Sequence, residues 1–180
     1  ATYPILGALY PVIAEYRYAH VPIGDGLTTV PHMFQVRYAD GTGYHLSYDG
    51  NHRLTKVADL AGVVLHSHGY GPDGRATFSE RSPGVERRSY VFESNRTLVT
   101  NLAGQVSTFE FESKPAGKFV SRVSGCDFCG AAGGTLTWER DDQGRVTRYV
   151  NADNHATAYH WNGAFLAGET DALGQDTTYG

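Results

Sequence analysis

The chain has 180 residues, of which 41% are hydrophobic and 19% are charged, and its formal net charge is −4. This balance argues against a disordered chain, and 15 Lys and Arg among 19 Asp and Glu give no basic stripe for binding nucleic acid. The 22 Gly and 12 Tyr favour many short strands joined by tight turns, which excludes an all-helical fold.

The N-terminal segment, residues 1–33, is apolar at its start but is interrupted by Pro4, Pro11, Glu15 and Arg17. It has no basic region followed by a continuous apolar core, so it does not resemble a signal peptide. No run in the chain approaches the roughly 18 apolar residues of a membrane span. We expect an irregular or strand-forming segment without a membrane span, in a chain that is part of a longer polypeptide.

From residue 34 to residue 180, apolar and polar side chains alternate. Phe34, Val36 and Tyr38 point to one face, and the alternation resumes at Tyr44 after the turn 39–43. The same spacing recurs in the pairs Tyr90 and Phe92, Phe109 and Phe111, Leu136 and Trp138, and Tyr159 and Trp161. A period of two, broken by Asp-Gly, Pro-Gly and Asn-Gly turns, is typical of consecutive antiparallel hairpins. We therefore predict an all-β fold, with residues 34–180 as one continuous domain of hairpin repeats.

A repeat of about 20 residues underlies this alternation. TDALGQDTTY at 170–179 matches TNLAGQVSTF at 100–109, and NADNHATAY at 151–159 and ADLAG at 58–62 begin further copies. Each copy contains a strand, an Asp or Asn, a glycine turn and a second strand that ends in an aromatic residue.

The repeated positions are predicted to be structural, because Asp and Asn cap turns, Gly accepts positive φ and aromatic rings bury area. These positions are Tyr48, Asp49, Asp59, Gly62, Asn101, Gly104, Phe109, Gly144, Arg145, Asn151, Tyr159, Asp171, Gly174 and Tyr179.

The segments YHLSYDGNHRLTKVAD at 44–59 and GRVTRYVNADNHATAYHWNG at 144–163 resemble the YD repeat of RHS-repeat proteins. That family includes bacterial RHS proteins, toxin-complex shell proteins and the teneurin-like YD shells. The resemblance implies an antiparallel hairpin sheet that spirals as part of a shell or forms an extended strip. It further implies a structural segment that encloses or displays another polypeptide, such as a toxin domain, in a secreted or cell-surface bacterial protein.

The chain also departs from the family pattern. It contains no Asp-Pro-x-x-Gly-rich core motif of the kind found near the self-cleavage point, and no toxin-like tail. Self-cleavage and toxicity are therefore expected to lie outside these residues. The expected partners are neighbouring repeats or subunits of a larger shell or polymer, together with an enclosed toxin polypeptide.

Cys126 and Cys129 are the only cysteines and stand in a glycine-rich setting. A disulfide that staples the turn, or a reduced pair packed in the sheet, is favoured over a thioredoxin-like redox site, because the glycines at 130–134 begin a helix poorly. A zinc site would need two more ligands, and His66 and His68 on one face of a strand are candidates for them.

No other pattern points to catalysis. A Gly-x-Ser-x-Gly elbow and a phosphate-binding loop are absent from the sequence, and no two carboxylates are singled out as an acid–base pair. We expect a non-catalytic protein without a cofactor. Two alternatives stay open: a self-assembling fibre or tube subunit, and a cell-surface adhesive or carbohydrate-binding module. The second would use exposed aromatic residues, with Tyr10, Tyr16, Tyr18 and Tyr70 as candidates.

Overall fold

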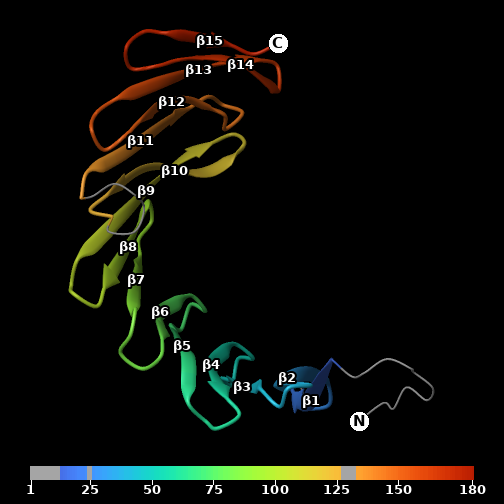
Figure 1. Cartoon of the computed structure of the whole chain (residues 1–180). Coiled ribbons are helices and arrows are strands. Elements are labelled where there is room, and N and C mark those ends of the chain that lie inside the picture. The colour runs from blue at the N-terminus through green and yellow to red at the C-terminus, as the bar shows by residue number, and fades with distance from the viewer. Residues whose placement is uncertain (1–12, 24–25, 127–132) are drawn as a thin grey trace. The chain divides into compact units, whose positions relative to one another are not determined.

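The computed structural model describes residues 13–23, 26–126 and 133–180, and in these residues it contains fifteen β-strands and no helix (Figure 1). The chain divides into two compact units, Ala1–Arg87 and Arg88–Gly180. Within each unit every strand pairs antiparallel with the next strand along the chain. The predicted all-β hairpin-repeat fold is therefore confirmed.

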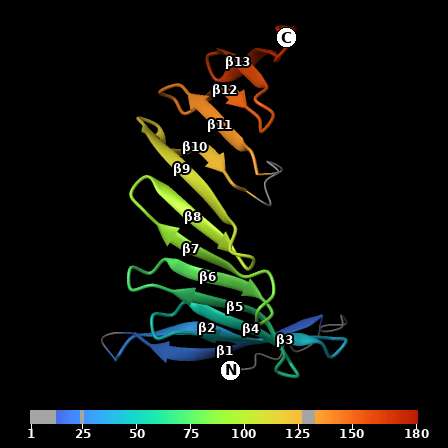
Figure 2. The same ribbon diagram turned by 90° about the vertical axis from the view of Figure 1, so that its left-hand side faces the viewer.

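The first unit holds six strands that follow one another in chain order (blue to green in Figure 2). They are β1 (Ala14–Pro22), β2 (Thr29–Tyr38), β3 (Gly43–Tyr48), β4 (Leu54–Asp59), β5 (Val64–Tyr70) and β6 (Ala76–Arg81).

The second unit holds nine strands that pair in the same way (green to red in Figure 1). They are β7 (Arg88–Phe92), β8 (Arg96–Asn101), β9 (Val106–Lys114), β10 (Gly117–Ser124), β11 (Thr135–Arg140), β12 (Val146–Val150), β13 (Ala156–Asn162), β14 (Phe165–Thr170) and β15 (Asp176–Thr178). Because consecutive strands are also spatial neighbours, each unit is an open meander that can be extended one hairpin at a time.

Register shifts occur at matching places in several hairpins. In the β3–β4, β5–β6 and β13–β14 pairs the shift falls immediately before Tyr48, Tyr70 and Trp161. The extra residue of each bulge lies on the following strand and is Thr55, Thr77 or Ala167. Because a β-bulge increases the local twist, the three aromatic residues stand where their ladder is locally twisted.

The sheet buries few side chains. The buried hydrophobic residues of the described part are Val36, Ala58, Val99, Val123, Cys126 and Leu136. The core cluster, in the second unit, consists of Val123, Cys126 and Leu136, and partly buried residues including Trp138 and Tyr149 pack against it. The alternation expected in β2 is present, but only Val36 of its apolar face is buried, whereas Phe34 and Tyr38 are 41% and 38% exposed. No second layer covers that face in the described residues.

Most of the described part of the N-terminal region is in strands. Strand β1 and the first half of β2 lie within residues 1–33, so β2 runs across the predicted boundary at residues 33 and 34. Among the described residues, no helix is long and apolar enough to cross a membrane.

Candidate functional site

One five-residue turn closes eight of the hairpins in the described residues, and two of these turns begin at Tyr38 and Gly71. The other six begin with an Asp or Asn, namely Asp49, Asp59, Asn101, Asp141, Asn151 and Asp171. In each of these six the backbone N–H of the first residue donates to the carbonyl of the fifth, and the N–H of the fourth donates to the carbonyl of the first, at 2.9–3.1 Å. This pattern is a three-residue hairpin loop with a bulge, whose fourth position favours positive φ.

The Asp or Asn side chain completes each of these six turns, which we call Asx turns. Its Oδ1 accepts the backbone N–H of the fifth residue in all six turns, and that of the third residue in five of them. These bonds satisfy loop donors that no strand partner can reach. The predicted repeat positions Asp49, Asp59, Asn101, Asn151 and Asp171 thus all lie at the first position of an Asx turn.

The fourth position of the turn has positive φ in every copy. Gly62, Gly104, Gly144 and Gly174, all predicted repeat positions, have φ between 79° and 88°. The other two turns carry Asn154 and His52, both with φ of 64°. Asn and His both occur in this left-handed conformation more often than other non-glycine residues, although each is more strained there than glycine.

The Asx turn at Asp49 carries an additional arginine contact. The Nε of Arg53, the fifth residue, donates to Asp49 Oδ2 at 2.8 Å, and its Nη2 lies 2.8 Å from the same oxygen. Its guanidinium carbon lies 4.7 Å from the ring centre of Tyr70, and Nη1 donates to the Gly71 carbonyl at 3.3 Å. Tyr70 in turn donates its hydroxyl to the Leu54 carbonyl at 2.8 Å.

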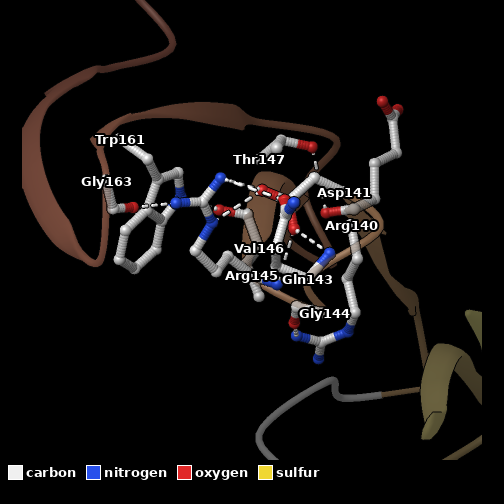
Figure 3. A network of polar contacts seen from close by, with 10 residues as sticks. Arg140, Asp141, Gln143, Gly144, Arg145, Val146, Thr147, Trp161 and Gly163 are labelled. Atoms are coloured by element: carbon white, nitrogen blue, oxygen red, sulfur yellow. Dashed lines mark hydrogen bonds and ion pairs between the residues drawn. The ribbon is translucent and has the colours of Figure 1, made fainter. Parts of the chain in front are cut away.

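The Asx turn at Asp141 repeats this arrangement in the second unit (Figure 3). Arg145 donates from Nε to Asp141 Oδ2 at 2.7 Å, and its guanidinium lies 5.4 Å from the ring centre of Trp161. Arg145 Nη1 also donates to the Gly163 carbonyl. The Trp161 indole N–H donates to the Val146 carbonyl at 2.8 Å.

We call each set of Asp, Arg and aromatic residue a clamp. In both clamps the aromatic residue comes from the hairpin that lies two strands further along the chain, so each clamp joins two successive hairpins. Tyr48 makes a link of the same kind through its ring and hydroxyl. The hydroxyl donates to the Met33 carbonyl of β2 at 2.9 Å. The predicted positions Tyr48 and Arg145 therefore hold hairpins together.

The clamp carboxylates are held in their charged form. The hydrogen bond from the Arg53 backbone N–H is the main cause that keeps the pKa of Asp49 below its ordinary value of 3.8. Burial acts to raise the pKa of Asp141, but the side-chain and backbone hydrogen bonds from Arg145 outweigh it and lower that pKa too.

An apolar groove of about 830 Å³ runs along one face of the second unit. It is lined by Phe109, Val120, Val123, Leu136, Trp138, Arg140, Val146, Tyr149, Tyr159, Trp161 and Leu166. The predicted aromatic positions Phe109 and Tyr159 face this groove. Burial, followed by the Glu169 carboxylate, raises the pKa of the Tyr159 hydroxyl. Tyr179 follows β15, donates its backbone N–H to the Ala167 carbonyl at 2.8 Å and is 46% exposed.

Cys126 is completely buried beside Val123 and Leu136, and its sulfur is part of a disulfide. Cys129 lies outside the described residues, so the role of the pair stays a prediction. In the first unit, His68 Nδ1 lies 3.0 Å from Ser79 Oγ and His66 is exposed. The described part of the chain holds no group of three or more His, Cys, Asp or Glu residues that could bind a metal ion.

The aromatic residues named as candidates for an adhesive surface lie in different surroundings. Tyr16 and Tyr18 are 55% and 52% exposed on β1, whereas Tyr10 lies outside the described residues. Tyr70 is not an exposed residue, because it is half-buried in the first clamp.

Two residues of the clamps were not predicted from the sequence. They are Asp141, which begins the Asx turn that contains the predicted positions Gly144 and Arg145, and Arg53. The signal was present, since Asp49 and Arg53 have the same spacing as Asp141 and Arg145. The aromatic partners were harder to find, because they lie about 20 residues further along the chain and in a different hairpin.

Solved structures share this fold. The crystal structure of TcdB2-TccC3-TEV matches 91% of this chain with a TM-score of 0.59 at 15% sequence identity. The crystal structure of TcdB2-TccC3 matches with a TM-score of 0.57 at 15% identity and also covers 91% of this chain. The Photorhabdus luminescens Tc holotoxin pore with a mutated TccC3 covers 82%, with a TM-score of 0.58 and 15% identity.

This chain spans only about a tenth of the matched chains, that is 10%, 10% and 9% of their lengths. No family model matches the sequence, and no curated protein matches it either. At 15% identity the likeness is one of fold, and it supports the RHS-like fold expected from the YD segments.

Proposed function

We propose that this chain is a non-catalytic wall segment of a hairpin-repeat shell that encloses or displays another polypeptide, such as a toxin domain. The observation that carries the proposal is the recurrence of one Asx turn along single-layered sheets. Each added hairpin lengthens such a sheet without thickening it, which is the geometry of a wall.

The clamps support the same role. A wall must resist separation of its hairpins, although the sheet buries few apolar side chains. Arg53 and Arg145 each fix a turn to the following hairpin through a carboxylate, an aromatic ring and a backbone carbonyl. Charge-assisted hydrogen bonds of this kind give direction as well as stability. On this proposal the repeated residues have structural roles, and neither a catalytic residue nor a cofactor is needed.

The matched structures support the proposal that this chain is part of a larger assembly. Their names describe complexes of TcdB2 with TccC3 and a Tc holotoxin pore. By analogy of fold, we place this chain in a longer, secreted or cell-surface bacterial protein, with adjoining repeats or subunits as its partners. The aromatic groove of the second unit would then be an apolar surface of the wall, available to a neighbouring polypeptide.

Protease protection of the complete polypeptide tests this role. The natural full-length protein would be digested under native conditions and its fragments identified by mass spectrometry. A wall predicts that a polypeptide region beyond the repeats resists cleavage, and that opening the second clamp with Arg145→Ala and Trp161→Ala exposes it. The matched control is Arg148→Ala, because Arg148 pairs with Glu139 on the exposed surface.

Equal cleavage of the wild-type and clamp variants outside the repeats would overturn the proposal. So would a protein in which every region outside the repeats is digested at the same rate as an unfolded chain.

A further inference from the structure

Two histidine rings meet at the first Asx turn. His32 lies on β2 and His52 lies in the turn between β3 and β4. The Nδ1 atom of His52 is 3.1 Å from the Nε2 atom of His32, and the ring centres are 4.9 Å apart at an interplanar angle of 78°. Both residues are half-buried. The facing nitrogen atoms thus lie in a defined, partly desolvated place.

His52 occupies the most restrictive position of this turn. Its φ is 64°, and the equivalent position in the other five Asx turns holds Gly or Asn. A histidine in the left-handed region carries strain of about 1 kcal/mol or more that glycine would avoid. The turn itself does not require a histidine. What the residue adds is an imidazole placed against His32.

The second ring is held in place independently of the first. The ring of His32 lies against Tyr48, with centres 4.4 Å apart and an interplanar angle of 32°. Tyr48 is itself fixed by the hydrogen bond from its hydroxyl to the Met33 carbonyl. A ligand ring that is oriented by its neighbours loses little freedom on binding.

The separation of the two nitrogen atoms fits a shared metal ion. With metal–nitrogen bonds of about 2.0–2.1 Å, two imidazoles on one ion lie about 2.9 Å apart in square-planar geometry and about 3.3 Å apart in tetrahedral geometry. The observed 3.1 Å falls between these values. The nearest arginine in the sequence, Arg53, is paired with Asp49, which offsets its repulsion of a cation.

We propose that His32 and His52 form a two-histidine site for a divalent transition-metal ion of the copper and zinc type, with water in the remaining coordination positions. Without metal the two rings share one hydrogen bond, in which one ring donates and the other accepts. When the ion binds, the donor ring shifts its proton to its other nitrogen, so that both facing nitrogens present lone pairs. Cu²⁺ is expected to bind more tightly than Zn²⁺, following the general order of affinities.

The test is a calorimetric titration of the natural full-length protein with CuCl₂ and with ZnCl₂ in a non-chelating buffer. The expected result is a saturable site that is tighter for Cu²⁺ and depends on His52. The variant His52→Gly should lower the affinity for the metal ion at least about tenfold, because it removes one of the two imidazole ligands. This variant keeps the turn, since glycine is the residue found in four of the equivalent turns. The matched control is His155→Gln, a histidine at the fifth position of another Asx turn, which should bind like the wild type.

A second readout identifies which histidines bind the ion. Imidazole ¹⁵N spectra with added ZnCl₂ should shift the His32 and His52 signals before those of the other histidines. Equal affinity of the wild type and His52→Gly, no saturable binding, or a first response at other histidines would each overturn the proposal. In those cases the pair is a hydrogen bond that fixes the turn and nothing more.

Discussion

At the scale of the residue, the fourth position of the Asx turn separates backbone effects from packing effects. Gly104 and Gly144 occupy the same position in two turns of the second unit, with φ of 79° and 82°. A Cβ on Gly104 would meet nothing within 4 Å, whereas a Cβ on Gly144 would overlap the Phe119 ring. The two glycines thus share a conformational demand and differ in their surroundings.

We predict that Gly104→Ala lowers the free energy of unfolding by about 1 kcal/mol, the cost of left-handed backbone at alanine. Gly144→Ala should lower it by about 2–4 kcal/mol, because displacement of the Phe119 ring adds an overpacking cost. Urea unfolding of both variants measures the difference. Equal losses would show that the Phe119 ring moves aside freely.

The clamp carboxylates determine how stability responds to acid. The pKa values of Asp49 and Asp141 lie below the ordinary 3.8, so each carboxylate favours the folded state while it is charged. A group with a depressed folded pKa contributes stability that is fully present above the unfolded pKa. That contribution is lost as the pH falls through the folded pKa.

We therefore expect these two contributions to be constant from pH 7 to about pH 5 and to decline below about pH 4. Asp141→Asn keeps the turn, as Asn101 and Asn151 do, but removes the charge opposite Arg145. This variant should be less stable than the wild type at pH 7, and the difference should shrink as the pH falls below about 4. Melting temperatures across this range measure it. A difference that stays constant with pH would contradict the assignment of the carboxylate's role.

At the scale of the element, the clamp links each hairpin to the next by a contact that the strand ladder does not provide. A β-bulge on the partner strand lies opposite Tyr70 and opposite Trp161, and both rings contact the arginine of the preceding hairpin. Arginine suits this place because its planar guanidinium can pair with a carboxylate, stack on a ring and donate to a carbonyl at once. Lysine, a single point charge, can satisfy only part of this set.

We predict that Arg145→Lys lowers the melting temperature by roughly 3–6 °C, although the charge is kept. Arg148→Lys serves as the control, since its pair with Glu139 is exposed and should change the melting temperature by less than about 1 °C. Equal effects of the two substitutions would show that the charge of Arg145 matters and its shape does not.

At the scale of the whole molecule, the described residues show strands paired only along the chain, with few side chains buried. Many large apolar side chains are consequently exposed, among them Leu27, Phe165 and Leu173 at 91%, 80% and 82%. Such surface is costly in water unless another polypeptide covers it.

We predict that the isolated chain self-associates at micromolar concentration, and that light scattering gives a mass above the 19.6 kDa of the monomer. Electron microscopy of the same fractions separates the alternatives. Irregular aggregates agree with a wall segment removed from its neighbours, and regular filaments favour a self-assembling subunit. A uniform monomer would show that the exposed apolar side chains need no cover.

The hairpins and their turns could be predicted from the residues alone. Alternation with a period of two and the recurring Asp, Asn and Gly positions are local signals, because a turn is closed by atoms within five residues of each other. For this reason Asp59, Gly62, Asn101, Gly104 and the equivalent residues could be assigned to turns without a structure.

The sequence did not reveal which hairpins contact each other through side chains or which faces stay exposed, because both depend on the three-dimensional arrangement of the strands. The contact of Arg145 with Trp161 and the approach of His52 to His32 join residues that are 16 and 20 positions apart. Such contacts depend on strand register and twist, which no local pattern specifies. The exposure of Phe34 and Tyr38 was equally hidden from the sequence. Alternation shows that a strand has an apolar face, and the presence of a second layer decides whether that face is buried.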